Sequence, residues 1–253
     1  MTGRLFLLPA PLIPYTPEAW DRENLALQLP GMAIKLYTTL DSFVVESERS
    51  ALRLLSRFKD AESMARLRLR VLNEHSRETE LPLLLEDLEQ GLDCGFLSEA
   101  GMPCIADPGA AFAAFARAKG VTIVPVSGPS SIVLGLAASG LEAQRFSFLG
   151  YMPQNSGERR AFITRMASAA LKDGITRLFI ETPYRNKSLT EDLVALLPES
   201  LWLCVASDLC GAGELIRSAP VAEWRSAEFA GPGKVPAIFI IGRKAGLRPA
   251  DSR

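Results

Sequence analysis

Short apolar runs alternate along the chain with segments in which apolar residues recur every three or four positions. The first pattern predicts strands and the second predicts helices. Strands are predicted over 4–8, 34–45, 94–97, 121–126, 145–149, 176–181, 201–207 and 235–241. Helices are predicted over 51–58, 81–92, 110–118 and 189–197. The repeated alternation of strand and helix predicts an α/β protein with mostly parallel sheets.

Two predicted strands end in loops rich in glycine and proline, and each loop leads into a helix. The loops lie within residues 96–109 and 121–131. In the first, Asp107 can cap the free amides of the helix, Pro108 suits its first position, and Gly101 lets the backbone approach a ligand closely. Loops at strand ends bind ligands in open α/β sheets. Both are candidate binding loops, with ordinary strand-to-helix turns as the alternative.

Short motifs follow one another along most of the chain. They read Ser-Glu-Ala-Gly-Met-Pro at 98–103, Asp-Pro-Gly at 107–109, Ser-Gly-Pro at 127–129, Ser-Gly-Leu at 139–141, Gly-Tyr-Met-Pro at 150–153 and Glu-Thr-Pro-Tyr-Arg at 181–185. Their order and spacing resemble the tetrapyrrole methylase superfamily of S-adenosylmethionine (SAM)-dependent methyltransferases. Within it, the chain is most similar to the branch of 16S ribosomal RNA 2′-O-methyltransferases.

The resemblance implies an architecture and a set of partners. It implies two α/β domains, at 1–128 and 129–246, with a cofactor cleft between them and a flexible tail at 247–253. It also implies SAM as the cofactor, ribosomal RNA or the small ribosomal subunit as the partner, and a homodimer.

The resemblance also implies which residues form the site. The implied cofactor-binding residues are Glu99, Ala100, Gly101, Met102, Pro103, Ile105, Ala106, Ser130, Leu149, Gly150 and Met152. A SAM enzyme mainly aligns donor and acceptor and excludes water, because the methyl group is already activated. A ribose hydroxyl acceptor is further helped by a base or an electrostatic aid, for which Glu181 and Arg185 are the first candidates and Glu46 and Arg49 the next. For each of these four, a salt bridge or a helix-start carboxylate is the structural alternative.

The chain differs from the ribosomal RNA branch at several motif positions. The opening loop at 9–15 lacks the usual Gly-Asn step, Glu99 and Met102 replace Asp and Thr, and Tyr184 replaces His. Two alternatives therefore stay open. One is methylation of a tetrapyrrole or another small molecule, and the other is a SAM-binding or interaction module without catalysis.

The charge pattern shows where RNA can bind. A formal net charge of -1 provides no general attraction for nucleic acid, so contact requires a local basic surface. Residues 65–72 alternate between arginine and apolar side chains, which predicts a strand with Arg66, Arg68 and Arg70 on one face. These three are the candidate substrate-binding residues. The alternative is a charged strand face that protects a sheet edge.

Composition excludes several other classes. The chain has 253 residues, 48% of them hydrophobic, which is enough for one large or two small domains. Its four cysteines form no Cys-x-x-Cys pair and His75 is its single histidine, which argues against a zinc site or a Ser-His-Asp hydrolase. The sequence shows no signal peptide, and unpaired thiols are typical of the reducing cytoplasm, so a cytoplasmic location is expected. No apolar run is long enough to span a membrane, so no membrane partner is expected. The hypothesis is thus a cytoplasmic SAM-dependent methyltransferase that acts in rRNA processing, methylating a ribose of small-subunit ribosomal RNA, with no metal.

Overall fold

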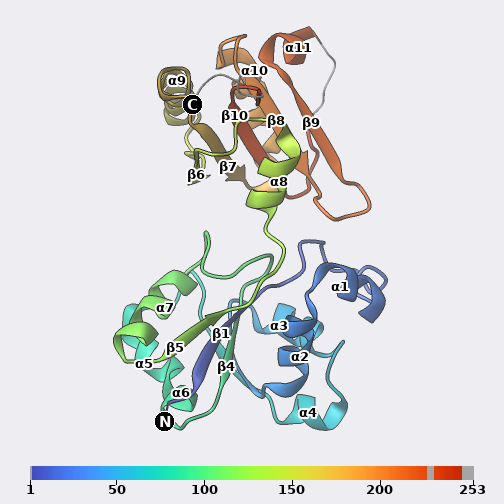
Figure 1. Cartoon of the computed structure of the whole chain (residues 1–253), viewed down its shortest axis with the longest axis vertical. Helices are drawn as coiled ribbons and strands as arrows, with labels where there is room; N and C mark the ends of the chain where they lie inside the picture. Colours follow the sequence, from blue (N-terminus) through green and yellow to red (C-terminus); the bar gives the residue numbers. More distant parts are fainter. Residues whose placement is uncertain (1, 227–230, 247–253) are drawn as a thin grey trace, which may run out of the picture. The chain divides into compact units, whose positions relative to one another are not determined.

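The computed structural model describes residues 2–226 and 231–246 and divides into two α/β domains (Figure 1). Domain 1 is Met1–Ser130 and domain 2 is Ser131–Arg253. This division lies two residues after the predicted boundary at 128/129. The predicted flexible tail at 247–253 lies outside the described residues. No described helix has the length and apolar character required to cross a membrane.

Domain 1 contains a five-stranded sheet in which every pairing is parallel. Its order is β3-β2-β4-β1-β5. The strands are β1 (Arg4–Leu8), β2 (Ser42–Val45), β3 (Arg68–Val71), β4 (Cys94–Leu97) and β5 (Thr122–Pro125). Because parallel strands all point the same way, the loops that follow them lie at one edge of the sheet.

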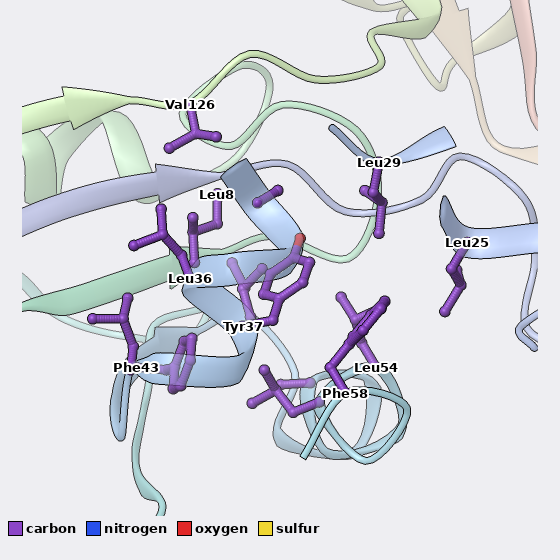
Figure 2. Packing of buried hydrophobic residues seen from close by; sticks show 14 of the residues in the cluster. Leu8, Leu25, Leu29, Leu36, Tyr37, Phe43, Leu54, Phe58 and Val126 are labelled. Carbon is purple, nitrogen blue, oxygen red and sulfur yellow. The ribbon is translucent and has the colours of Figure 1, made fainter. Parts of the chain in front are cut away.

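Helices cover both faces of this sheet. They are α1 (Arg22–Gln28), α2 (Gly31–Thr39), α3 (Glu48–Leu55), α4 (Ala61–Ala65), α5 (Leu81–Leu84), α6 (Glu86–Glu89) and α7 (Gly109–Ala118), with a 3-10 turn η1 (Glu78–Glu80). On β2, Phe43 and Val45 pack in the cluster of α1, α2 and α3 that Figure 2 shows, whereas Val44 packs with α5, α6 and α7. Successive strand residues therefore enter two separate cores. Within the first core, the Tyr37 hydroxyl donates a hydrogen bond to the Pro9 carbonyl and thereby anchors the loop after β1.

Domain 2 contains a five-stranded sheet of mixed direction, in the order β6-β7-β10-β8-β9. The strands are β6 (Phe146–Tyr151), β7 (Thr176–Glu181), β8 (Trp202–Ser207), β9 (Leu215–Pro220) and β10 (Ala237–Gly242). Among the described residues of this domain, β6 and β7 pair in parallel and the other strand pairs are antiparallel. Of the eight strand pairings in the described part of the chain, five are parallel, so the expectation of mostly parallel pairing is confirmed for the chain as a whole.

The three antiparallel pairings, all in domain 2, were not expected from the sequence. One arises because β8 turns directly into β9, which no prediction included, through residues 208–214. Asp208 and Cys210 adopt positive φ in this turn, and Asp208 Oδ2 accepts a hydrogen bond from Gly213 N at 2.8 Å. A turn this short joins antiparallel strands, whereas a parallel pair needs a crossover. The other two arise because β10 lies between β7 and β8 and runs against both.

The domain 2 helices also lie on two faces of their sheet. They are α8 (Ser131–Ser139), α9 (Ser156–Asp173), α10 (Asn186–Leu196) and α11 (Val221–Ser226), with a 3-10 turn η2 (Pro183–Arg185). Leu178 and Ile180 of β7 pack in the α8 cluster, whereas Phe179 packs in the cluster of α9, α10 and α11. Both faces of the central strands are thus buried, which explains why these strands appear in the sequence as continuous apolar runs.

Two predicted elements need correction. The strand predicted over 34–45 is a strand only at Ser42–Val45, because residues 31–39 form α2. Ala33, Leu36 and Tyr37 are the buried residues of α2, and their spacing of three and one places them on one side of the helix. The helix predicted over 81–92 is two short helices, α5 and α6, and it stops before Gly91, whose φ is 86°.

Candidate functional site

Three loops meet at the carboxyl edge of the parallel sheet in domain 1. The loop after β1 and the loop after β4 join through Ala10 and Gly101, whose backbones exchange hydrogen bonds of 2.8 and 3.0 Å. Gly101 has a φ of 69°, which favours glycine. In the loop after β5, a Cβ on Gly128 would overlap Pro9 and come within 3.3 Å of Met102 Sδ. The two loops singled out in the sequence are therefore packed together with the opening loop.

Asp107 fixes the conformation of the loop after β4. Its Oδ2 accepts a hydrogen bond from Cys104 N at 2.8 Å, and its Oδ1 accepts one from Gly109 N at 2.7 Å. Gly109 is the first residue of α7, so the predicted capping role is confirmed, although Pro108 lies one position before the helix. Cys104 and Ala106 have φ of 67° and 61°, which is unfavourable unless the surroundings hold it. The loop is thus built by its own contacts, and Ile105 is left 49% exposed on it.

Carboxylates gather around this loop. Glu46, directly after β2, accepts a hydrogen bond from Glu99 N at 3.1 Å, and Ser50 Oγ donates one to Glu99 Oε1 at 3.0 Å. Burial raises the pKa of Glu46, and the negative charges of Asp107 and Glu99 add to the effect. Burial also raises the pKa of Asp107. We call Glu46, Glu99 and Asp107 the acidic cluster; its repulsion would be relieved by a cationic ligand.

Cys104 and possible metal ligands are the other candidate reactive groups near this loop. Burial raises the pKa of Cys104 to about 12, with the charge of Asp107 as a second cause, so its thiol is protonated at neutral pH and is a poor nucleophile. Among the residues that the structure describes, no three His, Cys, Asp or Glu side chains are arranged to hold a metal ion.

A second group of candidate residues lies in domain 2, where β7 ends. The Glu181 side chain is fully buried. Its Oε1 accepts hydrogen bonds from Thr182 N at 2.7 Å and from Arg185 Nη2 at 2.5 Å. Arg185 is 16% exposed, and its hydrogen bond and ion pair with Glu181 raise its pKa. The structure therefore joins Glu181 and Arg185, the two first-ranked catalytic candidates, in one ion pair.

Three polar atoms of this group are buried without a hydrogen-bond partner. They are Glu181 Oε2, Arg185 Nε and Asn186 Oδ1. Asn186 Nδ2 donates to the carbonyls of Gly233 and Val235 at 3.0 and 2.8 Å, so its amide orientation is fixed by two acceptors. Unpaired buried polar atoms are rare and costly, and three of them lie on residues 181–186. Asn186 was not singled out in the sequence, because nothing local distinguishes it from a helix-start residue.

The remaining predicted cofactor residues lie in different surroundings. Ala100 and Ala106 are exposed on the loop after β4, Pro103 is buried in it, and Ser130 is the last residue of domain 1. In domain 2, Met152 is 2% exposed within the core, Leu149 packs against the same core, and Gly150 has a φ of 70° where β6 and β7 shift register. Their cofactor roles stay predictions.

The predicted basic strand differs from the structure at Arg66. This residue is the C-cap that follows α4, where its backbone N–H donates to the Ser63 carbonyl, and it lies outside β3, which begins at Arg68. All three arginines form ion pairs. Arg66 contacts Glu62 at 2.7 Å, and Arg68 and Arg70 contact the buried Asp87 at 3.3 and 3.5 Å. Arg70 also forms an ion pair with Glu86. Their RNA-binding role stays a prediction, but their charges are already paired.

Comparisons with known proteins agree with this architecture. A family model described as Tetrapyrrole (Corrin/Porphyrin) Methylases matches residues 35–224. Ribosomal RNA small subunit methyltransferase I of Escherichia coli O157:H7 is 30% identical over 221 residues, which cover 87% of this chain and 70% of that protein. The protein of the same name from Halalkalibacterium halodurans is 31% identical over 167 residues, which cover 65% of this chain and 54% of that protein.

Solved structures with similar folds are methyltransferases too. The crystal structure of the methyltransferase CobJ has a TM-score of 0.62 and 13% identity, covering 98% of both chains. The native form of uroporphyrin III C-methyltransferase from Thermus thermophilus has a TM-score of 0.55 and 18% identity, covering 95% of this chain and 97% of that one. At identities of 13% and 18%, these similarities show that the fold is shared and nothing more about this chain.

Proposed function

We propose that this chain, which belongs to the tetrapyrrole (corrin/porphyrin) methylases and is a SAM-dependent methyltransferase, methylates a ribose 2′-hydroxyl of small-subunit ribosomal RNA. The observation that carries the proposal is the match over 87% of the chain to a ribosomal RNA small subunit methyltransferase I. The matched region spans 70%, 63% and 54% of the length of three such relatives. Because part of each relative has no counterpart in the match, the RNA substrate and the ribose that is methylated are both proposed here.

The acidic cluster and its loop suit SAM as the methyl donor. SAM supplies a methyl group on a positively charged sulfonium and also carries an ammonium group. Burial raises the pKa of Glu46 and of Asp107, and a cation placed beside such carboxylates stabilises their charged form. The acidic cluster therefore fits the positive charge of SAM. The exposed Ile105 offers an apolar contact for the adenine. We therefore assign cofactor binding to the loop after β4.

Glu46 is the best placed proton acceptor among the four catalytic candidates. Bound SAM would supply the methyl group to the ribose oxygen, and the hydroxyl proton would pass to a carboxylate of this chain. A carboxylate with a raised pKa is a stronger base, and Glu46 is half-buried rather than enclosed. Its hydrogen bond from Glu99 N holds it beside the cofactor loop.

Arg185 and Glu181 take a different role in this proposal. Glu181 is fully buried, so it is a positioning residue that holds the partly exposed guanidinium of Arg185. Arg185 is the electrostatic aid that contacts the acceptor RNA, for which a guanidinium is well suited. Arg49, exposed on the first turn of α3, is a further basic group three residues after Glu46 in the chain.

The proposed function is tested by methyl transfer from isotopically labelled SAM. Small ribosomal subunits from cells that lack this protein serve as acceptor, and fully methylated subunits serve as the control. We expect label in a 2′-O-methylated nucleoside of the first subunits only. Transfer to a porphyrin or corrin acceptor instead would favour the small-molecule alternative, and SAM binding without any transfer would favour the interaction module.

Glu99→Gln is expected to weaken SAM binding about two- to fivefold, because an exposed charge pair contributes up to about 1 kcal/mol. S-adenosylhomocysteine, which lacks the sulfonium charge, should lose less affinity. Titration calorimetry with both ligands measures the difference. Glu23→Gln, an equal charge change at an exposed position of α1, is the control. Equal losses for both ligands would argue against a charge effect.

We also propose a cytoplasmic homodimer. The four cysteines are free thiols, which supports a reducing compartment. Dimerisation rests on the family resemblance.

A further inference from the structure

A row of arginines follows the acidic cluster along the chain. Arg49 and Arg53 lie on α3, and Arg57 lies in the hydrogen-bonded turn that continues it. Residues four positions apart lie on the same side of a helix. We call these three residues the basic row.

The basic row differs from the predicted basic strand in its charge balance. Within residues 2–226 and 231–246, no member of the basic row forms an ion pair with a carboxylate. Arg57 Nε is also buried without a hydrogen-bond partner. Arg66, Arg68 and Arg70, by contrast, each contact at least one carboxylate. Of these two basic surfaces, the basic row is therefore the one whose positive charge is not compensated by a carboxylate in the described part of the chain.

Tyr15 holds two of the guanidinium groups in place. Their Cζ atoms lie 4.4 Å (Arg53) and 6.0 Å (Arg57) from the centroid of its ring. Trp20 packs edge-on against Tyr15 at 5.3 Å and donates its indole N–H to the Ile13 carbonyl at 3.0 Å. Tyr15, supported by Trp20, therefore orders the two arginines before any partner binds, which lowers the entropy lost on binding.

The basic row also begins beside the candidate active site. Glu46 lies two residues before α3, and Ser50, the neighbour of Arg49, donates its hydroxyl hydrogen bond to Glu99. One end of a polyanion bound along the basic row would therefore lie near the acidic cluster.

We propose that the basic row is the surface through which domain 1 binds the phosphate backbone of the RNA acceptor. This inference rests on the proposed function and adds the surface that contacts the substrate. Planar guanidinium groups suit phosphate, and contacts to phosphate supply most of the affinity of sequence-independent binding. The surface predicted from the sequence, Arg66, Arg68 and Arg70, is the rival.

The test compares double variants of the full-length protein. Binding to under-methylated small ribosomal subunits is measured at several salt concentrations for Arg53→Gln/Arg57→Gln and for the rival Arg66→Gln/Arg68→Gln. Arg117→Gln/Lys119→Gln, an equal charge change at exposed positions around the end of α7, is the matched control. Arg53→Lys/Arg57→Lys keeps the charge. SAM affinity, measured for every variant, reports whether the cofactor loop is intact.

We expect Arg53→Gln/Arg57→Gln to bind subunits on the order of tenfold more weakly. The slope of log K against log salt concentration should become shallower by about 1.5, because each of the two lost phosphate contacts contributes about 0.7–0.9 to it. The lysine variant should keep most of the affinity, and the matched control should bind like the unmodified protein. Loss in the rival variant instead, or equal loss in the lysine variant, would overturn the inference while leaving the proposed function standing. Absence of subunit binding and methyl transfer by the unmodified protein would overturn both.

Discussion

Glu46→Gln is expected to lower kcat for RNA methylation by about 10²- to 10⁴-fold, the usual contribution of a positioned general base. The amide keeps the shape of the side chain and can still accept the hydrogen bond from Glu99 N, but it cannot take the ribose proton. SAM affinity should change only severalfold, because Glu99 and Asp107 keep their charges. Single-turnover rates with under-methylated subunits separate this effect from binding.

The pH dependence of the same reaction provides a second test. A base must be ionised, so activity should rise with pH through the raised pKa of Glu46, and Glu46→Gln should lose this rise.

The stability of the folded protein should instead fall as the pH rises through this pKa. A carboxyl whose pKa is raised by folding contributes stability below its unfolded pKa and loses it as the pH rises through the folded value. Glu46→Gln lacks that loss, so it should be no less stable than the unmodified protein at neutral pH.

Unchanged kcat in Glu46→Gln, with the same pH profile, would remove Glu46 as the base. Glu181→Gln would then be the next variant, because Glu181 is the other carboxylate among the catalytic candidates. Glu23→Gln controls for the charge change.

Arg185→Met is expected to destabilise domain 2 by about 3–5 kcal/mol, because it leaves the Glu181 carboxylate buried without its cation. Thr182 still donates to Glu181 Oε1, but Oε2 has no partner in either protein. Removing both charges in Glu181→Gln/Arg185→Met should recover much of the loss.

Hydrogen exchange followed peptide by peptide measures this effect within each domain. Faster exchange is expected in β7 and α10, and domain 1 peptides serve as an internal reference. Arg165→Met, the same replacement at an exposed position of α9, is the matched control and should cost less than about 0.5 kcal/mol. An equal loss in the double variant would show that Arg185 acts through its packing and not through the ion pair.

The sequence predicted those parts of the fold whose causes are local. The run over 176–181 is apolar enough to be buried on both faces, and it is β7 at the same bounds. Asp107 lies two residues before the first helical amide, so its capping bond follows from spacing alone. The helix over 31–39 was missed, although its buried residues have helical spacing, because the apolar run was assigned to a strand.

Only the tertiary structure decided which charges are available to a partner. Arg70 and Asp87 are 17 residues apart and meet because α6 packs beside the sheet, which neutralises a strand that looks basic in the sequence. Arg57 and Tyr15 are 42 residues apart, and their contact orders a surface that the sequence did not indicate. The local pattern of residues determines strands, helices and caps, because those depend on neighbours in the chain. Ion pairs between residues far apart in sequence, unpaired buried atoms and the direction of β10 depend on partners brought together by folding.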